Sequence, residues 1–180
     1  LLDGAPIAST PRRALARRLA MVPQETRATF DFSVLEMVMM GRYPHLGPLA
    51  LEGPDDLEIA RAALRATGTA AFESRAFATL SGGEKQRVVI AGALAQASDA
   101  LLLDEPTSAL DLHYQLDIAS LLRSLNRERG TTLVVSTHDL NLAASLCRHV
   151  VLLRSGRVLA QGPTADTLTS ANIRALYNVD

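Results

Sequence analysis

Two carboxylates, Asp104 and Glu105, follow a short apolar run in the segment "ALLLDEP". An uninterrupted apolar run of this length predicts a strand of a parallel sheet that is buried on both faces. Ligands of open α/β sheets bind at the carboxyl ends of such strands. Asp suits a Mg²⁺ shell, directly or through water, and the neighbouring Glu can polarise a water for attack on a phosphoryl group. The alternative is an acidic turn after a core strand.

Two further polar residues follow predicted strands. The run "TTLVVST" predicts a strand parallel to the first, which would deliver His138 to the same edge of the sheet. An imidazole there could hydrogen-bond a terminal phosphate and help to orient a water, although a lone histidine is more often structural. Gln24 follows the short strand predicted in "LAMVPQ". Its amide could contact Mg²⁺ or the attacking water, and it could act as a hinge at the entry to the helices that follow.

A helix start in "LSGGEKQRVV" offers a third kind of chemistry. Ser81 and Glu84 have the spacing of a capping box, and Gly82 and Gly83 expose backbone N–H groups without a Cβ in the way. Together with the helix macrodipole, these groups meet the requirements of a phosphate site. A flexible helix start is the alternative. Asp111 is expected to be the N-cap of a later helix, whatever else it does.

The elements that must position these residues are strands separated by helices. Helices are predicted from Ser33, with Glu36 completing a capping box and Gly41 ending the helix, and from about Asp55 to Gly68. A Pro/Gly-rich loop separates these two. A hairpin is predicted to turn at Ser155-Gly156, and a small helix to end the chain. The helix of residues 112–129 carries an apolar stripe, whose members are Leu112, Leu116, Ala119, Leu122 and Leu125.

These elements predict an α/β fold with a largely parallel sheet. The helical stretch of residues 30–97 is expected to form a lobe inserted into the sheet domain. The sheet domain would then consist of residues 1–29, which end in the segment of Gln24, and residues 98–165. Residues 166–180 are expected to form the C-terminal helix.

Composition restricts the function further. A net charge of −1 offers no general electrostatic case for nucleic acid binding, and the single Cys147 excludes an intrachain disulfide and fits a reducing cytoplasm. No apolar run approaches the roughly 20 residues that cross a bilayer, so any membrane association is expected to go through a partner. The chain opens on Leu1 within a stretch typical of folded protein, so we expect an N-terminal portion to precede it.

The order of these segments resembles the nucleotide-binding subunit of ABC transporters over essentially the whole chain. In that family the segments are the Q-loop, the signature motif, Walker B, the catalytic glutamate, the D-loop and the switch histidine. Here they are Gln24, Leu80–Glu84, Leu101–Asp104, Glu105, Ser108–Asp111 and His138. The resemblance implies a partial RecA-like P-loop NTPase core with an inserted α-helical signature subdomain.

The resemblance also implies cofactors and partners. ATP and Mg²⁺ are the expected cofactors, with Glu105, His138 and Gln24 in catalysis and Asp104 and Gln24 at the metal. Nucleotide binding is assigned to Ser81, Gly82, Gly83, Glu84 and Asp111. Two subunits are expected to close head-to-tail around ATP and to drive membrane permease subunits, which they contact through the helical subdomain and the Q-loop. A substrate-binding protein would take part indirectly. The expected location is the cytoplasmic face of the inner membrane, as a peripheral subunit.

One family motif is absent from the printed sequence. It contains no G-x-x-x-x-G-K-[ST], and Lys85 lies inside the predicted signature helix, so Lys85 cannot be the P-loop lysine. The segment "LLDGAPI" resembles the family's stretch shortly after the P-loop helix, which implies that several tens of residues precede it. We therefore expect no ATP hydrolysis from the 180 residues alone.

The segments "VLEMVMMGRYPHLG" and "STHDLNLAASLCRHVVLLRSGRVLAQG" resemble ATPases of importers for iron–siderophores, haem and vitamin B12. In such importers this lobe meets the permease, so Arg42, Tyr43 and His45 are expected near that interface. A solvated connection is the alternative for this loop. The methionines at positions 37, 39 and 40 are interpreted as core packing.

Other classes of protein share part of this pattern. DNA-repair and chromosome-maintenance ATPases interrupt the lobe with long coiled coils, for which the 57 positions between Gln24 and Ser81 leave no room. A translation-associated ABC protein would carry two cassettes and a charged linker. An ABC exporter, another transport system or a non-hydrolysing cassette module stay open as alternatives.

Overall fold

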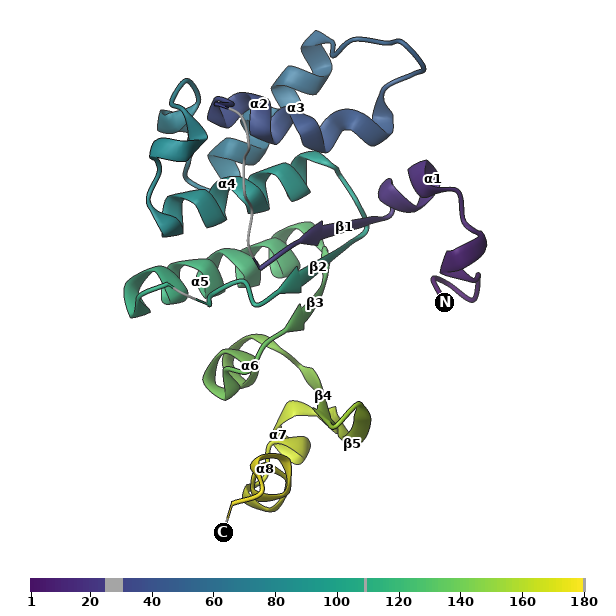
Figure 1. Ribbon diagram of the computed structural model, residues 1–180, viewed down its shortest axis with the longest axis vertical. Coiled ribbons are helices and arrows are strands. Elements are labelled where there is room, and N and C mark those ends of the chain that lie inside the picture. The colour runs from purple at the N-terminus through teal and green to yellow at the C-terminus, as the bar shows by residue number, and fades with distance from the viewer. Residues whose placement is uncertain (25–30, 109, 180) are drawn as a thin grey trace. The chain divides into compact units, whose positions relative to one another are not determined.

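The first part of the chain contains a three-stranded parallel sheet (Figure 1). The structure is a computed structural model that describes residues 1–24, 31–108 and 110–179. The sheet has the order β1 (Leu19–Val22), β2 (Ala100–Asp104) and β3 (Thr132–Ser136), all parallel. The parallel pairing expected from the sequence is therefore confirmed.

The chain divides into two compact units, Leu1–Ser136 and Thr137–Asp180. The first unit contains α1 (Arg12–Ala16), α2 (Val34–Met39), α3 (Pro54–Ala66), α4 (Gly82–Ala95), α5 (Leu112–Arg129) and the sheet. It also has short 3₁₀ helices at Ile7–Ser9, Met40–His45, Ala70–Phe72 and Phe77–Thr79. The domain limits predicted from the sequence stay predictions.

The sheet buries one of its two faces among the described residues. Ala20 and Val22 of β1 and Leu101 and Leu103 of β2 share that face and are fully buried. In the opposite row, Met21 is 60% exposed and Val134 is 53% exposed. Burial on both faces was predicted, and it is observed for one face of the described sheet. Burial alternates along each strand because successive side chains point to opposite faces.

The helical lobe forms its own apolar core. Its capping box is confirmed, since the backbone N–H of Ser33 donates to the Glu36 carboxylate over 2.7 Å. Gly68 follows α3 with φ of +67°, as expected of a glycine just beyond a helix. The side chains that make this core come from α2, α3, α4 and the segment before α4, and include Val34, Val38, Leu64, Phe77 and Val88.

Gly41 does not end helix α2 in the way predicted. The chain continues from α2 into the 3₁₀ helix Met40–His45, where a loop was expected. A Cβ at position 41 would lie 2.1 Å from the carbonyl oxygen of Gly92 in α4. Glycine is therefore required there for the close approach of two backbones rather than for a helix stop.

Helix α5 buries a narrower face than the predicted stripe. Its N-cap is Asp111, whose carboxylate accepts the backbone N–H of Tyr114 over 3.2 Å, as expected. Leu112 is 69% exposed and Leu116 is 58% exposed, so the stripe was wrong at its N-terminal end. Leu112 is the first residue of the helix, and a period of 3.6 residues places Leu116 on the side away from Leu122 and Leu125. That face consists of Ile118, Ala119, Leu122 and Leu125.

The second unit contains an antiparallel hairpin and three short helices. Ser155 and Gly156 both have positive φ, as the turn of a two-residue hairpin requires, so the predicted hairpin is confirmed. The terminal helix is also confirmed, whereas α7 was not anticipated. The elements are α6 (Leu140–Leu146), β4 (His149–Arg154), β5 (Arg157–Pro163), α7 (Thr164–Thr167) and α8 (Ser170–Tyr177). Across the described residues, none of the helices is both long and apolar enough to cross a membrane.

Candidate functional site

The start of α4 is a capped helix N-terminus with two glycines in its first turn. The backbone N–H of Ser81 donates to the Glu84 carboxylate over 2.8 Å, and the Ser81 hydroxyl accepts the N–H of Glu84 over 3.4 Å. The hydrogen bond from the Ser81 backbone N–H, and secondly the hydrogen bond of the Ser81 side chain to the same carboxylate, hold the pKa of Glu84 below its usual range. Early N–H groups of a helix have no acceptor within it, so those of Gly82 and Gly83 are suited to an anion.

The turn after β2 holds Glu105 in an unusual backbone conformation. Its φ is +48°, which is uncommon for a residue other than glycine. Its N–H donates to Ser136 O at the end of β3 over 2.9 Å. Its carbonyl accepts the backbone N–H of Ser108 over 3.1 Å and the Ser108 hydroxyl over 3.0 Å. Such strained residues cluster at functional sites, and these bonds hold Glu105 at the carboxyl end of the strand.

Gln24 and Asp104 also lie at this edge of the sheet. Gln24 is exposed and comes two residues after β1, the parallel neighbour of β2, which ends in Asp104. The structure therefore brings Gln24, Asp104 and Glu105 to the carboxyl ends of adjacent strands. Residues 25–30, which follow Gln24, and Ala109 of the predicted D-loop lie outside the described residues.

His138 belongs to the second unit and is exposed there. Its backbone carbonyl accepts the hydroxyl of Tyr177 over 3.4 Å. The next residue, Asp139, caps α6 by accepting the N–H groups of Asn141 and Leu142. That His138 shares a site with Glu105 stays a prediction.

The acidic residues at the sheet edge fit a metal only in company with other ligands. Within residues 1–24, 31–108 and 110–179, no three His, Cys, Asp or Glu side chains gather as a metal centre. Mg²⁺ commonly binds through one or two carboxylates, phosphate oxygens and several waters. The oxygen donors of Asp104 and of the Gln24 amide fit a Mg²⁺ that arrives with a nucleotide.

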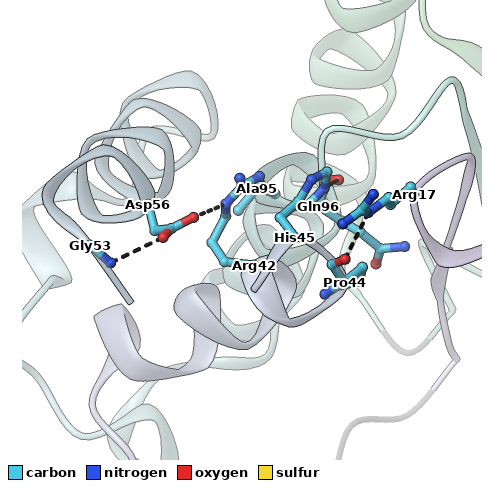
Figure 2. Close-up of polar contacts among 8 residues, drawn as sticks. All are labelled: Arg17, Arg42, Pro44, His45, Gly53, Asp56, Ala95 and Gln96. Atoms are coloured by element: carbon cyan, nitrogen blue, oxygen red, sulfur yellow. Dashed lines mark hydrogen bonds and ion pairs between the residues drawn. The ribbon is translucent and has the colours of Figure 1, made fainter. Parts of the chain in front are cut away.

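A polar network in the first unit was missed by the sequence analysis (Figure 2). Arg42 is 6% exposed; its guanidinium donates to Asp56 over 2.9 Å and to the carbonyl of Ala95 over 2.7 Å. His45 Nε2 donates to the carbonyl of Gln96 over 2.8 Å. These partners are 14 to 53 positions apart in the sequence, so no local spacing of residues predicts the contacts between them. Arg42 therefore joins α3 and α4 to the 3₁₀ helix between α2 and α3.

The same network attaches the helical lobe to α1 and β1. Arg13 and Arg17 both donate through Nε to the carbonyl of Pro44, over 3.0 Å and 2.8 Å. The Gln96 amide donates to the carbonyls of Ala16 and Leu19. Of the three residues expected near a partner, Arg42 is buried in this network and His45 is partly buried in it. Tyr43 is 68% exposed.

Replacing Arg42 with Met is expected to lower the free energy of unfolding by about 3 kcal/mol, because it leaves a partly buried carboxylate without its cation. The backbone N–H of Gly53, and secondly Arg42, hold the pKa of Asp56 below its usual range, so Asp56 stays ionised near neutral pH. Urea unfolding of the purified protein measures the change. The control is Arg65→Met, which breaks the exposed pair with Glu58 and should cost below about 1 kcal/mol. Equal losses in the two variants would contradict a structural role for Arg42.

Comparisons with known proteins find both similar sequences and similar structures. A family model described as "ABC transporter" matches residues 1–108. The achromobactin transport ATP-binding protein CbrD of Dickeya dadantii is 40% identical over 180 residues, which are 100% of this chain and 67% of that protein. The hemin import ATP-binding protein HmuV of Pseudomonas entomophila is 44% identical over 184 residues, covering 99% of this chain and 70% of that protein.

Among solved structures, the dimeric post-hydrolysis state of the ATP-binding cassette MJ0796, bound to ADP and Pi, superposes with a TM-score of 0.75 at 30% identity. The match covers 90% of this chain and 71% of that one. The chain thus spans about two thirds of the length of these two curated relatives.

Proposed function

Because this chain belongs to the ABC transporter family, we propose that the complete protein binds and hydrolyses ATP to drive an importer. The imported substrate is an iron complex, either a siderophore or haem, or else vitamin B12. The names of the relatives, one for achromobactin and one for hemin, support the iron complex. The observation that carries the proposal is the capped glycine start of α4 in one compact unit with Asp104 and Glu105.

Each site residue has a role in this proposal. Asp104 and Gln24 would hold the Mg²⁺ that accompanies ATP. The Glu105 carboxylate would accept a proton from the attacking water, and His138 would hydrogen-bond the terminal phosphate. When bound, ATP would supply the phosphoryl group, and its Mg²⁺ would neutralise charge on the phosphates. The printed sequence holds no P-loop motif, so the 180 residues alone are not expected to turn ATP over.

The start of α4 would serve the nucleotide of a second subunit. Two copies of the complete protein would close head-to-tail, so that Ser81, Gly82, Gly83 and Glu84 of one copy approach the ATP held by the other. Asp111 would order the D-loop beside them. The dimeric state of the MJ0796 cassette with ADP and Pi supports this arrangement.

The remaining partners are a permease and, through it, a substrate-binding protein. A permease contact is proposed for Tyr43, which is 68% exposed in the 3₁₀ helix Met40–His45. The protein would then act as a peripheral subunit at the cytoplasmic face of the membrane. No role in nucleic acid binding is proposed.

A deletion strain tests the transport proposal. It is grown with ferric siderophores or haem as the sole iron source, and separately under a requirement for vitamin B12. Growth should fail on one of these substrates and return when the complete gene is supplied. Normal growth of the deletion strain on all of them would overturn import of these substrates and favour another transport system.

A further inference from the structure

The two glycines at the start of α4 meet different surroundings. Gly82 is exposed, and a Cβ added there would lie 3.7 Å from Leu110 Cδ2, an ordinary contact. Gly83 is buried, and its added Cβ would lie 2.4 Å from Cδ1 and 2.6 Å from Cγ of Tyr114. Real Cβ atoms essentially never approach another heavy atom within 3.0 Å. The ring of Tyr114 therefore lies directly on the α-carbon of Gly83.

Tyr114 is itself held at the start of α5. Its backbone N–H donates to the N-cap carboxylate of Asp111 over 3.2 Å, and its ring lies 5.5 Å from that of His113. One turn further along each helix, Arg87 of α4 forms an ion pair with Asp117 of α5. The contact of Tyr114 with Gly83 is thus the first of two successive links between the helices.

This contact connects two parts of the candidate site. Ser108 bonds to the carbonyl of Glu105, and Asp111, three residues later, caps the helix that carries Tyr114. The ring then meets Gly83, which follows Ser81 by two residues. The ring of Tyr114 therefore connects the turn of Glu105, the candidate catalytic carboxylate, to the start of α4, the candidate anion site.

We propose that Tyr114 is a positioning residue, which sets the start of α4 relative to the turn of Glu105. In this inference, which rests on the proposed function, Gly83 is a glycine because the ring occupies the space of a Cβ. The exposed backbone in the first turn of α4 would be the part that a phosphate approaches. An aromatic ring suits this task because it is rigid and has only two side-chain torsions.

A double-mutant cycle in the complete protein tests the proposal. Gly83→Ala should lower kcat for ATP by about 100-fold, because a displacement of about 1 Å in a site can cost that much. Tyr114→Ala should lower kcat by about tenfold, since the start of α4 is no longer held. Removing the ring should relieve the clash, so the double variant should recover about tenfold of the activity lost in Gly83→Ala. Tyr114→Phe keeps the ring and should keep kcat, measured where every variant stays folded.

Three outcomes would overturn the inference. The first is a double variant no more active than Gly83→Ala, which would mean that the glycine serves the phosphate alone. The second is full activity of Tyr114→Ala. The third is a Tyr114→Phe variant as impaired as Tyr114→Ala, because the hydroxyl and not the ring would then matter.

Denaturant midpoints of the same four proteins separate this inference from the proposed function. The shifts of Gly83→Ala and Tyr114→Ala should be non-additive if the two residues pack together, whether or not the protein hydrolyses ATP. A wild-type protein without ATP hydrolysis would overturn the proposed function. Additive shifts in denaturant midpoint would overturn the contact. If Gly83→Ala does not fold, recovery of folding in the double variant would likewise show that Gly83 and Tyr114 pack together.

Discussion

Replacing Glu105 with Gln in the complete protein is expected to lower ATP hydrolysis by about 1000-fold and to let an ATP-bound dimer accumulate. The amide has the shape of the carboxylate but cannot accept a proton from the attacking water. The backbone of residue 105 is held by Ser108 and Ser136 through bonds that the substitution leaves in place. Phosphate release measures turnover, and size-exclusion chromatography with ATP measures the dimer.

The matched control for this prediction is Glu128→Gln. Glu128 is an exposed residue near the end of α5, and it has no role in the proposed site. The control removes the same charge from the same unit and should leave hydrolysis within about twofold of wild type, since surface substitutions are usually small in effect. Near-normal hydrolysis by Glu105→Gln would exclude Glu105 as the residue that activates the water.

Replacing Gly41 with Ala is expected to lower the free energy of unfolding by about 3 kcal/mol, the upper part of the usual range for overpacking. The added Cβ would lie 2.1 Å from the carbonyl oxygen of Gly92, 3.1 Å from its carbonyl carbon and 3.2 Å from the N of Gln96. All three are backbone atoms of one helical segment, which cannot rotate away as a flexible side chain would. Urea unfolding of the purified protein measures the loss.

Gly47→Ala is the control for Gly41→Ala. A Cβ at position 47 has its nearest neighbour, the Cβ of Ala50, at 3.5 Å, an ordinary contact. Loss of glycine from the unfolded chain favours the folded state by about 0.4–1 kcal/mol where the new residue fits. The control should therefore be neutral or slightly stabilising. If both variants lost the same stability, the cause would not be the approach of the backbone of Gly41 to α4.

The local elements of this protein are determined by short stretches of its sequence. The capping boxes at Ser33 and Ser81, the N-cap at Asp111 and the turn at Ser155-Gly156 all depend on residues within three positions of one another. Hydrogen bonds and backbone preferences over such distances are the same wherever the segment lies. The residue types of the candidate site were therefore visible in the sequence, although their joint role stays a proposal.

Packing between distant segments needed the tertiary structure. Three contacts each join residues 14 to 51 positions apart: the partly buried pair of Arg42 and Asp56, the approach of Gly41 to Gly92, and the ring of Tyr114 on Gly83. None of these contacts follows from a spacing, because it depends on how two helices meet and on which side chain fills the space between them. Glycines 41 and 83 show the difference well. The sequence by itself placed each at a helix end, and only the tertiary structure decided that a neighbouring backbone or ring excludes any larger residue.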